Sequence, residues 1–116
     1  MLTNPREFEC TDPFGQRWTV KLLWHQVGIA IRHADTVDCK FLLQSDGEQT
    51  EKVIALPHSI LKSLAKEYNR EISDAWVIKL AAEHLKYMIE SGEDLEKTLV
   101  TLRADDLQRS QAVLTA

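Results

Sequence analysis

The fold is decided within residues 51–68, EKVIALPHSILKSLAKEY, where the spacing of the apolar side chains changes. Residues 51–56 are predicted to form a strand, whereas after Pro57 the apolar residues recur every three or four positions, as on one face of a helix. Proline cannot donate a hydrogen bond to a strand ladder, so the strand region is expected to end at Pro57. This stretch therefore predicts a β region followed by an α region.

Upstream of this boundary, apolar residues recur with the period of two that is typical of β-strands. This pattern and the intervening turn sequences predict strands at about residues 6–11, 18–24, 27–31, 37–43 and 51–56. In the second of them, one face is expected to carry Trp18, Val20, Leu22 and Trp24. The short turns between successive strands predict an antiparallel meander.

Downstream of Pro57, helical spacing predicts helices at about residues 58–69 and 74–91. Ser73 or Asp74 is expected to cap the start of the longer helix, and Gly92 its end. Leu95, Leu99 and Leu102 continue the helical spacing and predict a third helix, with a strand as the alternative because residues 98–102 are also β-prone. Residues 104–116 are mostly polar and are expected to form a flexible C-terminal tail.

These elements combine into one α+β domain over residues 1–103, with strands at about 6–56 and helices at about 58–102. The predicted architecture is a two-layer sandwich, in which two to three helices pack on one face of an antiparallel meander of about five strands. A chain of 116 residues is the size of one domain.

The composition argues against nucleic-acid and membrane partners. The chain has 14 Lys and Arg against 18 Asp and Glu, a net charge of −4, and no run of three basic residues. No stretch approaches the ~20 apolar residues that span a bilayer, and the N-terminus lacks the apolar run of a signal peptide. The expected location is the cytoplasm. Cys10 and Cys39 are expected to be buried free thiols, with one bridge between neighbouring strands as the alternative.

The densest cluster of polar side chains is at the predicted turn around residues 32–39. His33, Asp35 and Asp38 supply nitrogen and oxygen ligands that a divalent metal could use, particularly if His25 reaches the same end of the sheet. The alternative is turn chemistry, in which Asp35 and Thr36 form local hydrogen bonds. We favour the turn, because a change of chain direction separates residues 33 and 35. No cofactor is predicted.

His84 lies on the apolar face of the long predicted helix, between Leu80 and Met88. A buried histidine can act as a ligand or a general base, but it is more often a structural residue whose ring nitrogens are satisfied within the core. The chain contains no GxSxG, GxGxxG, Walker-type or HExxH motif. The sequence therefore favours a protein that is not an enzyme.

A surplus of apolar side chains points instead to an interaction surface. Leu23 and Trp24 place apolar groups on both faces of one predicted strand, and Met88 and Ile89 do so on the long helix. Leu23, Trp24 and Ile89 are thus the candidate contact residues, with a sheet-margin packing role for Trp24 as the alternative. The favoured hypothesis is a homodimer or a module that binds another protein. The competing hypotheses are a small metal- or ligand-dependent enzyme using the turn at His33–Asp38, and a regulatory module that senses a small molecule between helices and sheet.

Overall fold

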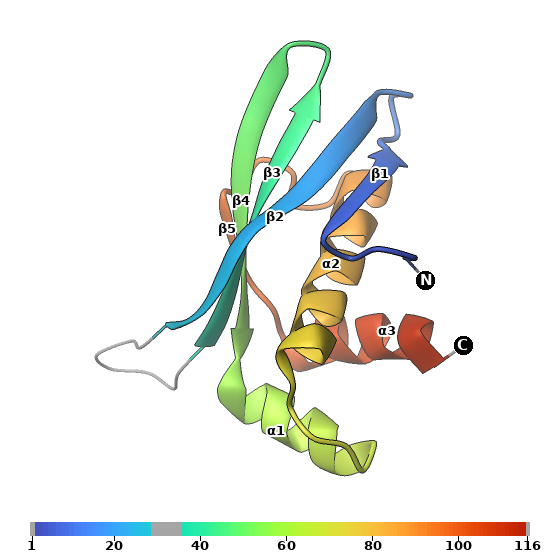
Figure 1. The fold of residues 1–116 in the computed structure, drawn as a ribbon. Helices are drawn as coiled ribbons and strands as arrows, with labels where there is room; N and C mark the ends of the chain where they lie inside the picture. Colours follow the sequence, from blue (N-terminus) through green and yellow to red (C-terminus); the bar gives the residue numbers. More distant parts are fainter. Residues whose placement is uncertain (1, 29–35, 116) are drawn as a thin grey trace.

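The computed structural model describes residues 2–28 and 36–115, which form a five-stranded sheet with three helices on one of its sides (Figure 1). The strands are β1 (Glu7–Thr11), β2 (Arg17–Gly28), β3 (Thr36–Ser45), β4 (Glu48–Pro57) and β5 (Leu99–Thr101). The helices are α1 (His58–Glu67), α2 (Asp74–Ser91) and α3 (Ala104–Thr115). The predicted α+β class, with helices packed on a mostly antiparallel sheet, is confirmed.

The sheet combines a meander with one late addition. Its order is β1-β2-β3-β4-β5, with antiparallel pairing from β1 to β4 and parallel pairing of β5 with β4. The predicted helix at Leu95–Leu102 is therefore wrong, and the alternative is right for Leu99–Thr101. Backbone bonds from Val53 N–H to Thr98 O and from Leu102 N–H to Ala55 O, both 2.8 Å, hold this segment on the edge of β4.

The strands predicted at 18–24 and 27–31 are not separated by a turn, because β2 runs without interruption from Arg17 to Gly28. Its pairing with β3 shifts by one residue at Leu23, so that Leu22 lies opposite Phe41 while Trp24 lies opposite Lys40. Such a β-bulge reverses which residues face the core beyond it. Trp18, Val20 and Leu22 keep their predicted face, but Trp24 lies on the opposite one.

Helix α2 forms the centre of the helical layer and is the best-predicted element. The Ser73 hydroxyl accepts a hydrogen bond from Trp76 N–H, and Gly92 ends the helix with a φ of 79°. The side chains of α2 that face the sheet are fully buried with those of β3 and β4. Burial of apolar surface on this scale is the main stabilising contribution to such a fold.

The residues expected to form a tail from 104 onward instead form α3, which packs against α1 and α2. Leu107 is fully buried, and the indole N–H of Trp76 donates a 2.7 Å hydrogen bond to Gln111 Oε1 in the interior. Asp106 accepts a hydrogen bond from Arg103 N–H at the start of the helix, which satisfies a backbone donor there. The polar composition of residues 104–115 therefore does not indicate that they form a helix with one buried face.

A buried lysine fixes the connection between α2 and β5. Lys52 projects from β4 toward the helical layer, and its ammonium donates to Leu95 O and Lys97 O, both at 2.6 Å. Burial lowers the pKa of Lys52, while Glu96 opposes this effect. These charged hydrogen bonds hold the segment that connects α2 to β5 in place.

Cys10 and Cys39 are both free and buried, as predicted. Burial raises the pKa of Cys10 to about 11 and that of Cys39 to about 12. At neutral pH both are thiols, not the thiolates that nucleophilic or metal-binding chemistry requires.

Candidate functional site

The sheet has one face covered by the helices and one that is not, which we call the open face (Figure 1). On β3, every second side chain from Val37 to Ser45 is buried, and those between them are half-buried on the open face. Because paired residues on neighbouring strands point to the same side of a sheet, the register identifies the rest of the open face.

One row of the open face crosses four strands and is largely apolar. The register pairs Trp24 with Lys40, Lys40 with Val53, and Val53 with Leu99. Trp24 is 39% exposed and Leu99 is 57% exposed, and the half-buried Leu42 lies in the adjoining row. We call these four residues, together with Leu42 from the adjoining row, the central row. Val53 and Leu99 are direct neighbours, whereas Lys40 lies between Val53 and Trp24.

The charges of the open face neutralise one another locally. Three basic side chains each lie beside a carboxylate on a neighbouring strand. The pairs and their N···O distances are Arg17–Glu9 at 3.8 Å, Lys21–Glu7 at 3.9 Å and Lys40–Glu51 at 2.9 Å. Exposed pairs of this kind contribute little to stability. Their consequence is that the central row is not surrounded by charge of one sign.

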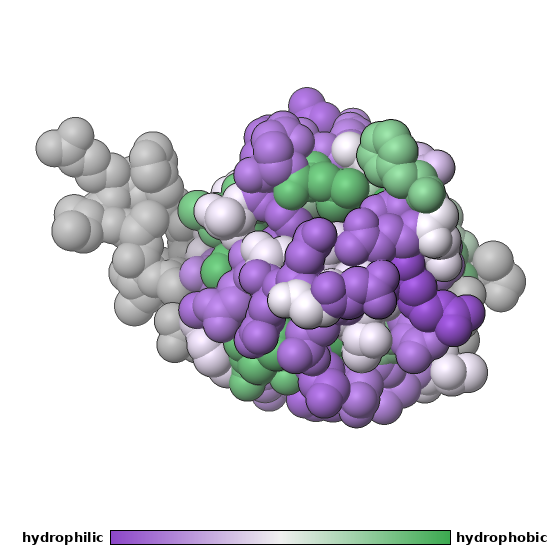
Figure 2. Space-filling view, turned by 90° about the horizontal axis from the view of Figure 1, so that it is seen from above, coloured by the Kyte–Doolittle hydropathy of each residue, from purple (hydrophilic) through white to green (hydrophobic). Residues whose placement is uncertain are grey.

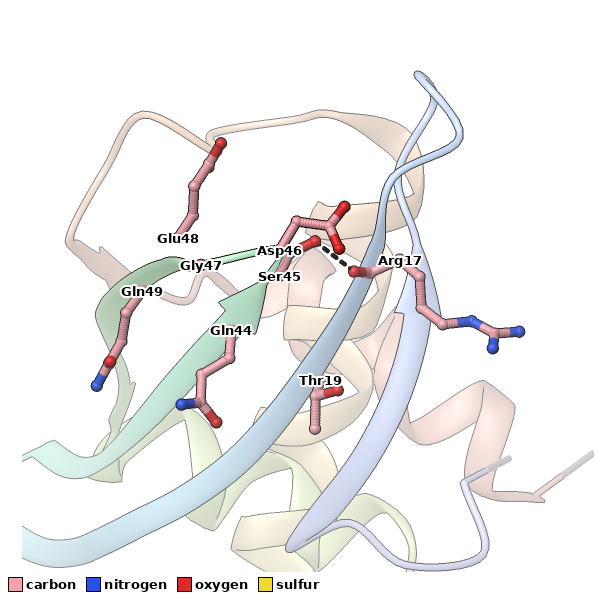
Figure 3. A pocket seen from close by; sticks show the side chains of 8 residues that line it. All are labelled: Arg17, Thr19, Gln44, Ser45, Asp46, Gly47, Glu48 and Gln49. Carbon is pink, nitrogen blue, oxygen red and sulfur yellow. Dashed lines mark hydrogen bonds between the residues drawn. The ribbon is translucent and has the colours of Figure 1, made fainter.

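A polar hollow of about 390 Å³ borders the central row at the β3–β4 turn. Thr19 and Gln44 point into it from the open face, and the Ser45 hydroxyl donates to Arg17 O at 2.6 Å (Figure 3). The end of the molecule that carries this turn is mostly hydrophilic, with apolar groups in small separate areas (Figure 2). The open face therefore has an apolar middle and a polar border.

The residues predicted for a metal site are not all placed by the structure. His33 and Asp35 lie outside the described residues. Asp38 lies on the open face and accepts a 2.9 Å hydrogen bond from the Thr36 hydroxyl. His25 lies on the helix side, opposite Cys39, with Nε2 3.5 Å from Asp74 Oδ2. His25 and Asp38 thus lie on opposite faces of the sheet and do not converge. Within the described ranges, no three His, Cys, Asp or Glu side chains are grouped to hold a metal ion.

The residues predicted for an interaction surface fall in two different environments. Leu23 and Trp24 are exposed at the bulge of β2, and Leu23 is 43% exposed. Ile89 is fully buried in the core, so it offers no surface to a partner. The sequence did not identify Leu42, Val53 and Leu99, because only strand pairing places them on the same face of the sheet as Trp24.

His84 is buried as expected, being 4% exposed, but its expected satisfaction within the core is wrong. Its Nδ1 has no hydrogen-bond partner among the described residues. An unpartnered buried nitrogen costs about 1–3 kcal/mol of stability. Burial lowers the pKa of His84 below its usual 6.5, with Asp106 opposing the shift, so the ring is neutral at pH 7. The side chain lines a pocket of about 360 Å³ between α2, β5 and the start of α3.

Comparison with known proteins finds no match, whether to family models, to curated proteins or to solved structures. In the described part of the chain, none of the helices has the length and apolarity to cross a bilayer.

Proposed function

We propose that the protein is a self-associating interaction module, in which two copies pack their open faces against each other. The observation that carries this proposal is the central row: its positions on β2, β4 and β5 are the apolar Trp24, Val53 and Leu99, and no helix within residues 2–28 and 36–115 covers this face of the sheet. An exposed group of this kind is uncommon on a monomer and is typical of contact surfaces.

Two properties of the open face favour a second copy as the occupant. With ~4.8 Å between strands and ~3.3 Å per residue, its described strands cover roughly 600 Å², near the ~800 Å² per partner of a stable interface. A chain with net charge −4 repels its own copy, but the paired charges of the open face reduce that repulsion where the copies would meet. Sheets pack in this way at an angle of about 30°.

We therefore propose that the functional unit is a homodimer. We also propose that it is located in the cytoplasm. The free, buried Cys10 and Cys39 fit a reducing compartment. A metal-dependent enzyme is the weaker hypothesis, because His25 and Asp38 lie on opposite faces of the sheet.

The test is the molar mass in solution of the wild type and three variants, measured by light scattering during size-exclusion chromatography. Trp24→Ser and Leu99→Ser each remove an exposed apolar group from the central row and should shift the wild-type dimer to the monomer mass. Phe14→Ser is the matched control, because Phe14 is 91% exposed at the β1–β2 turn, away from the central row. It should leave the dimer intact. A monomeric wild type at all concentrations, or equal effects of Phe14→Ser and Trp24→Ser, would contradict the proposal.

A further inference from the structure

A shallow groove lies between the exposed side of α1 and the segment that connects α1 to α2, and we call it the α1 groove. Helix α1 follows directly after β4, at the end of the molecule away from the β3–β4 turn (Figure 1). The groove has a volume of about 480 Å³. Its lining residues are Lys62, Ser63, Ala65, Lys66, Arg70 and Ile72.

The three basic side chains of the α1 groove have no carboxylate partner in the described part of the chain. Lys62, Lys66 and Arg70 are all exposed, and within residues 2–28 and 36–115 none of them lies within 4.0 Å of a carboxylate oxygen. Lys62 and Lys66 are one turn apart on the same side of α1, where like charges repel. An anion bound in the groove would relieve this repulsion.

The nearest carboxylates along the chain do not line the groove. Glu67 follows Lys66, and Glu71 follows Arg70, but neither is among the lining residues. Glu67 instead accepts a 2.7 Å hydrogen bond from Gln108 of α3. The groove is therefore a site of local positive charge on a chain whose net charge is −4.

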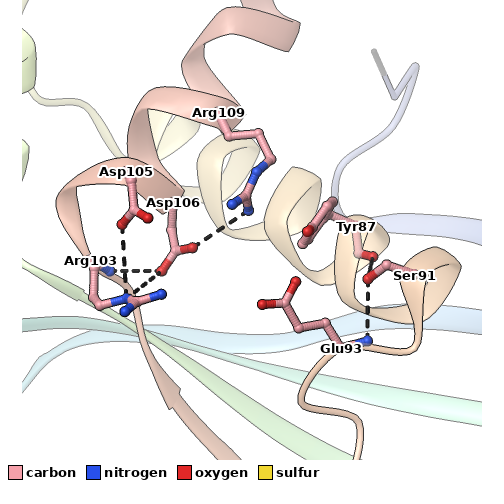
Figure 4. A network of polar contacts seen from close by, with 7 residues as sticks. All are labelled: Tyr87, Ser91, Glu93, Arg103, Asp105, Asp106 and Arg109. Atoms are coloured by element: carbon pink, nitrogen blue, oxygen red, sulfur yellow. Dashed lines mark hydrogen bonds and ion pairs between the residues drawn. The ribbon is translucent and has the colours of Figure 1, made fainter.

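Elsewhere in the described ranges, most basic side chains lie within 4.0 Å of a carboxylate. On α3, for example, Arg103 and Arg109 lie on either side of the Asp106 carboxylate (Figure 4). Lys40 of the open face lies 2.9 Å from Glu51. The α1 groove thus differs from the rest of the described surface in offering several cations that the protein itself does not pair.

Arg70 is held in place by an aromatic ring beneath it. Its guanidinium carbon lies 4.6 Å from the centre of the Trp76 ring, and Trp76 is 1% exposed. Its Nε donates to Glu71 O at 3.5 Å. Stacking on the ring uses a face of the guanidinium, so the terminal Nη groups can donate to a carboxylate. A guanidinium that is already positioned loses less conformational entropy when it binds a ligand.

The exposed lining between these charges is mostly carbon. Ile72 is half-buried and packs against the core, and the lysine side chains contribute their aliphatic portions. A ligand that matches this surface carries an apolar group with carboxylates around it. Because the cations are spread along α1 and the connection that follows, a chain with several carboxylates contacts more of them than a single small anion does. A flat bilayer surface would contact only the rim of a groove.

We propose that the α1 groove binds an acidic peptide segment of a partner protein, in which carboxylates flank an apolar side chain. The carboxylates pair with Lys62, Lys66 and Arg70, and the apolar side chain packs against Ile72. None of the lining residues of the groove belongs to the central row. The proposal can therefore fail while self-association holds, and the reverse is also true.

The experiment is a ¹⁵N NMR titration of the full chain with three peptides: EELEELEE, the uncharged QQLQQLQQ, and EEEEEEEE, which has no apolar side chain. EELEELEE should bind saturably, with the largest shifts at the backbone amides of Lys62, Lys66 and Ile72, and added salt should weaken it. The other two should bind at least about fivefold more weakly, because one lacks the charges and the other lacks the apolar groups.

Three results would overturn the proposal. The first is the absence of EELEELEE binding, or shifts centred outside the α1 groove. The second is equal binding of QQLQQLQQ. The third is tighter binding at the groove by phosphatidylserine vesicles or by a single-stranded oligonucleotide, which would identify a lipid or a nucleic acid as the ligand.

Two double variants with the same change of charge locate the contact. Lys62→Gln/Lys66→Gln should weaken EELEELEE binding by at least about fivefold, as expected for the loss of two exposed ion pairs. Arg6→Gln/Lys79→Gln removes two exposed cations outside the groove lining and should leave the affinity nearly unchanged. Equal affinities of the two double variants would overturn the assignment of the groove.

Discussion

At the scale of single residues, whether a buried polar side chain finds a hydrogen-bond partner depends on the atoms around it and not on its residue type. Lys52 and His84 are both buried polar side chains of the helix-facing interior. Lys52 is satisfied by two carbonyl oxygens, whereas His84 retains an unpartnered nitrogen. The sequence places His84 on the buried side of a helix correctly, but it contains no signal for which atoms come within hydrogen-bond distance of the ring. The atoms around the ring depend on where β5 and α3 lie, and the local sequence around His84 does not determine their positions.

The buried neutral state of His84 predicts a pH-dependent stability. Its pKa is lowered in the folded protein, so as the pH falls through 6.5 the unfolded chain takes up a proton that the folded chain does not. Between about pH 7.5 and about pH 5.5 this should remove up to ~1.4 kcal/mol from the free energy of unfolding. Denaturant unfolding at both pH values should show a larger loss for the wild type than for His84→Leu, which cannot titrate there. Equal losses would contradict the buried neutral state.

At the scale of elements, the sequence predicted those whose periodicity is local. The α2 helix is recovered with both its caps, because Ser73, the apolar face and Gly92 all lie within one short stretch. The bulge in β2 was missed although its signal is present: apolar residues occupy even positions up to Leu22 and odd positions from Val27 onward. A turn between two strands produces the same change of phase, so the alternation alone does not distinguish a turn from a bulge. β5 was missed because three residues become a strand only when β4 offers them a free edge.

The end of α2 gives a test of local backbone strain. Gly92 has a φ of 79°, and a Cβ built there would lie 3.4 Å from Pro13 Cγ. Gly47 has a φ of 84° with no heavy atom within 4 Å of such a Cβ. Gly47→Ala should therefore cost about 1–2 kcal/mol of stability from the left-handed backbone alone. Gly92→Ala should cost about the same, because a Cβ there meets the Pro13 ring only at ordinary contact distance. Thermal and denaturant unfolding measure both, and a loss well below ~1 kcal/mol for either variant would contradict this account.

At the scale of the whole molecule, the two layers depend on the C-terminal helix. A chain ending at Arg103 loses the fully buried Leu107 and the Gln111 partner of the Trp76 indole. Loss of a single buried leucine side chain typically costs about 2–5 kcal/mol, so this truncation should abolish cooperative unfolding or lower stability by more than ~3 kcal/mol. Circular dichroism during denaturation measures the change. A truncated chain with wild-type stability would show that residues 104–116 act as the tail that their composition suggests.

At this scale the two faces of the sheet also differ in role. One face holds the core, and the other presents the central row. The candidate contact residue Trp24 could be predicted from sequence, since three consecutive apolar residues interrupt the alternation of the strand. Val53 and Leu99 could not, because they are 29 and 75 residues away along the chain and only strand pairing places them in the same row as Trp24.

The most direct test of self-association is an isotope-filtered NMR experiment on a mixture of ¹³C-labelled and unlabelled protein. It detects only contacts between different copies. Intermolecular signals are expected from the methyl groups of Leu42, Val53 and Leu99, which lie on the open face. Signals confined to methyl groups of the helical layer, such as Ile60 on α1 and Val113 on α3, would contradict the proposed interface, as would the absence of any intermolecular signal.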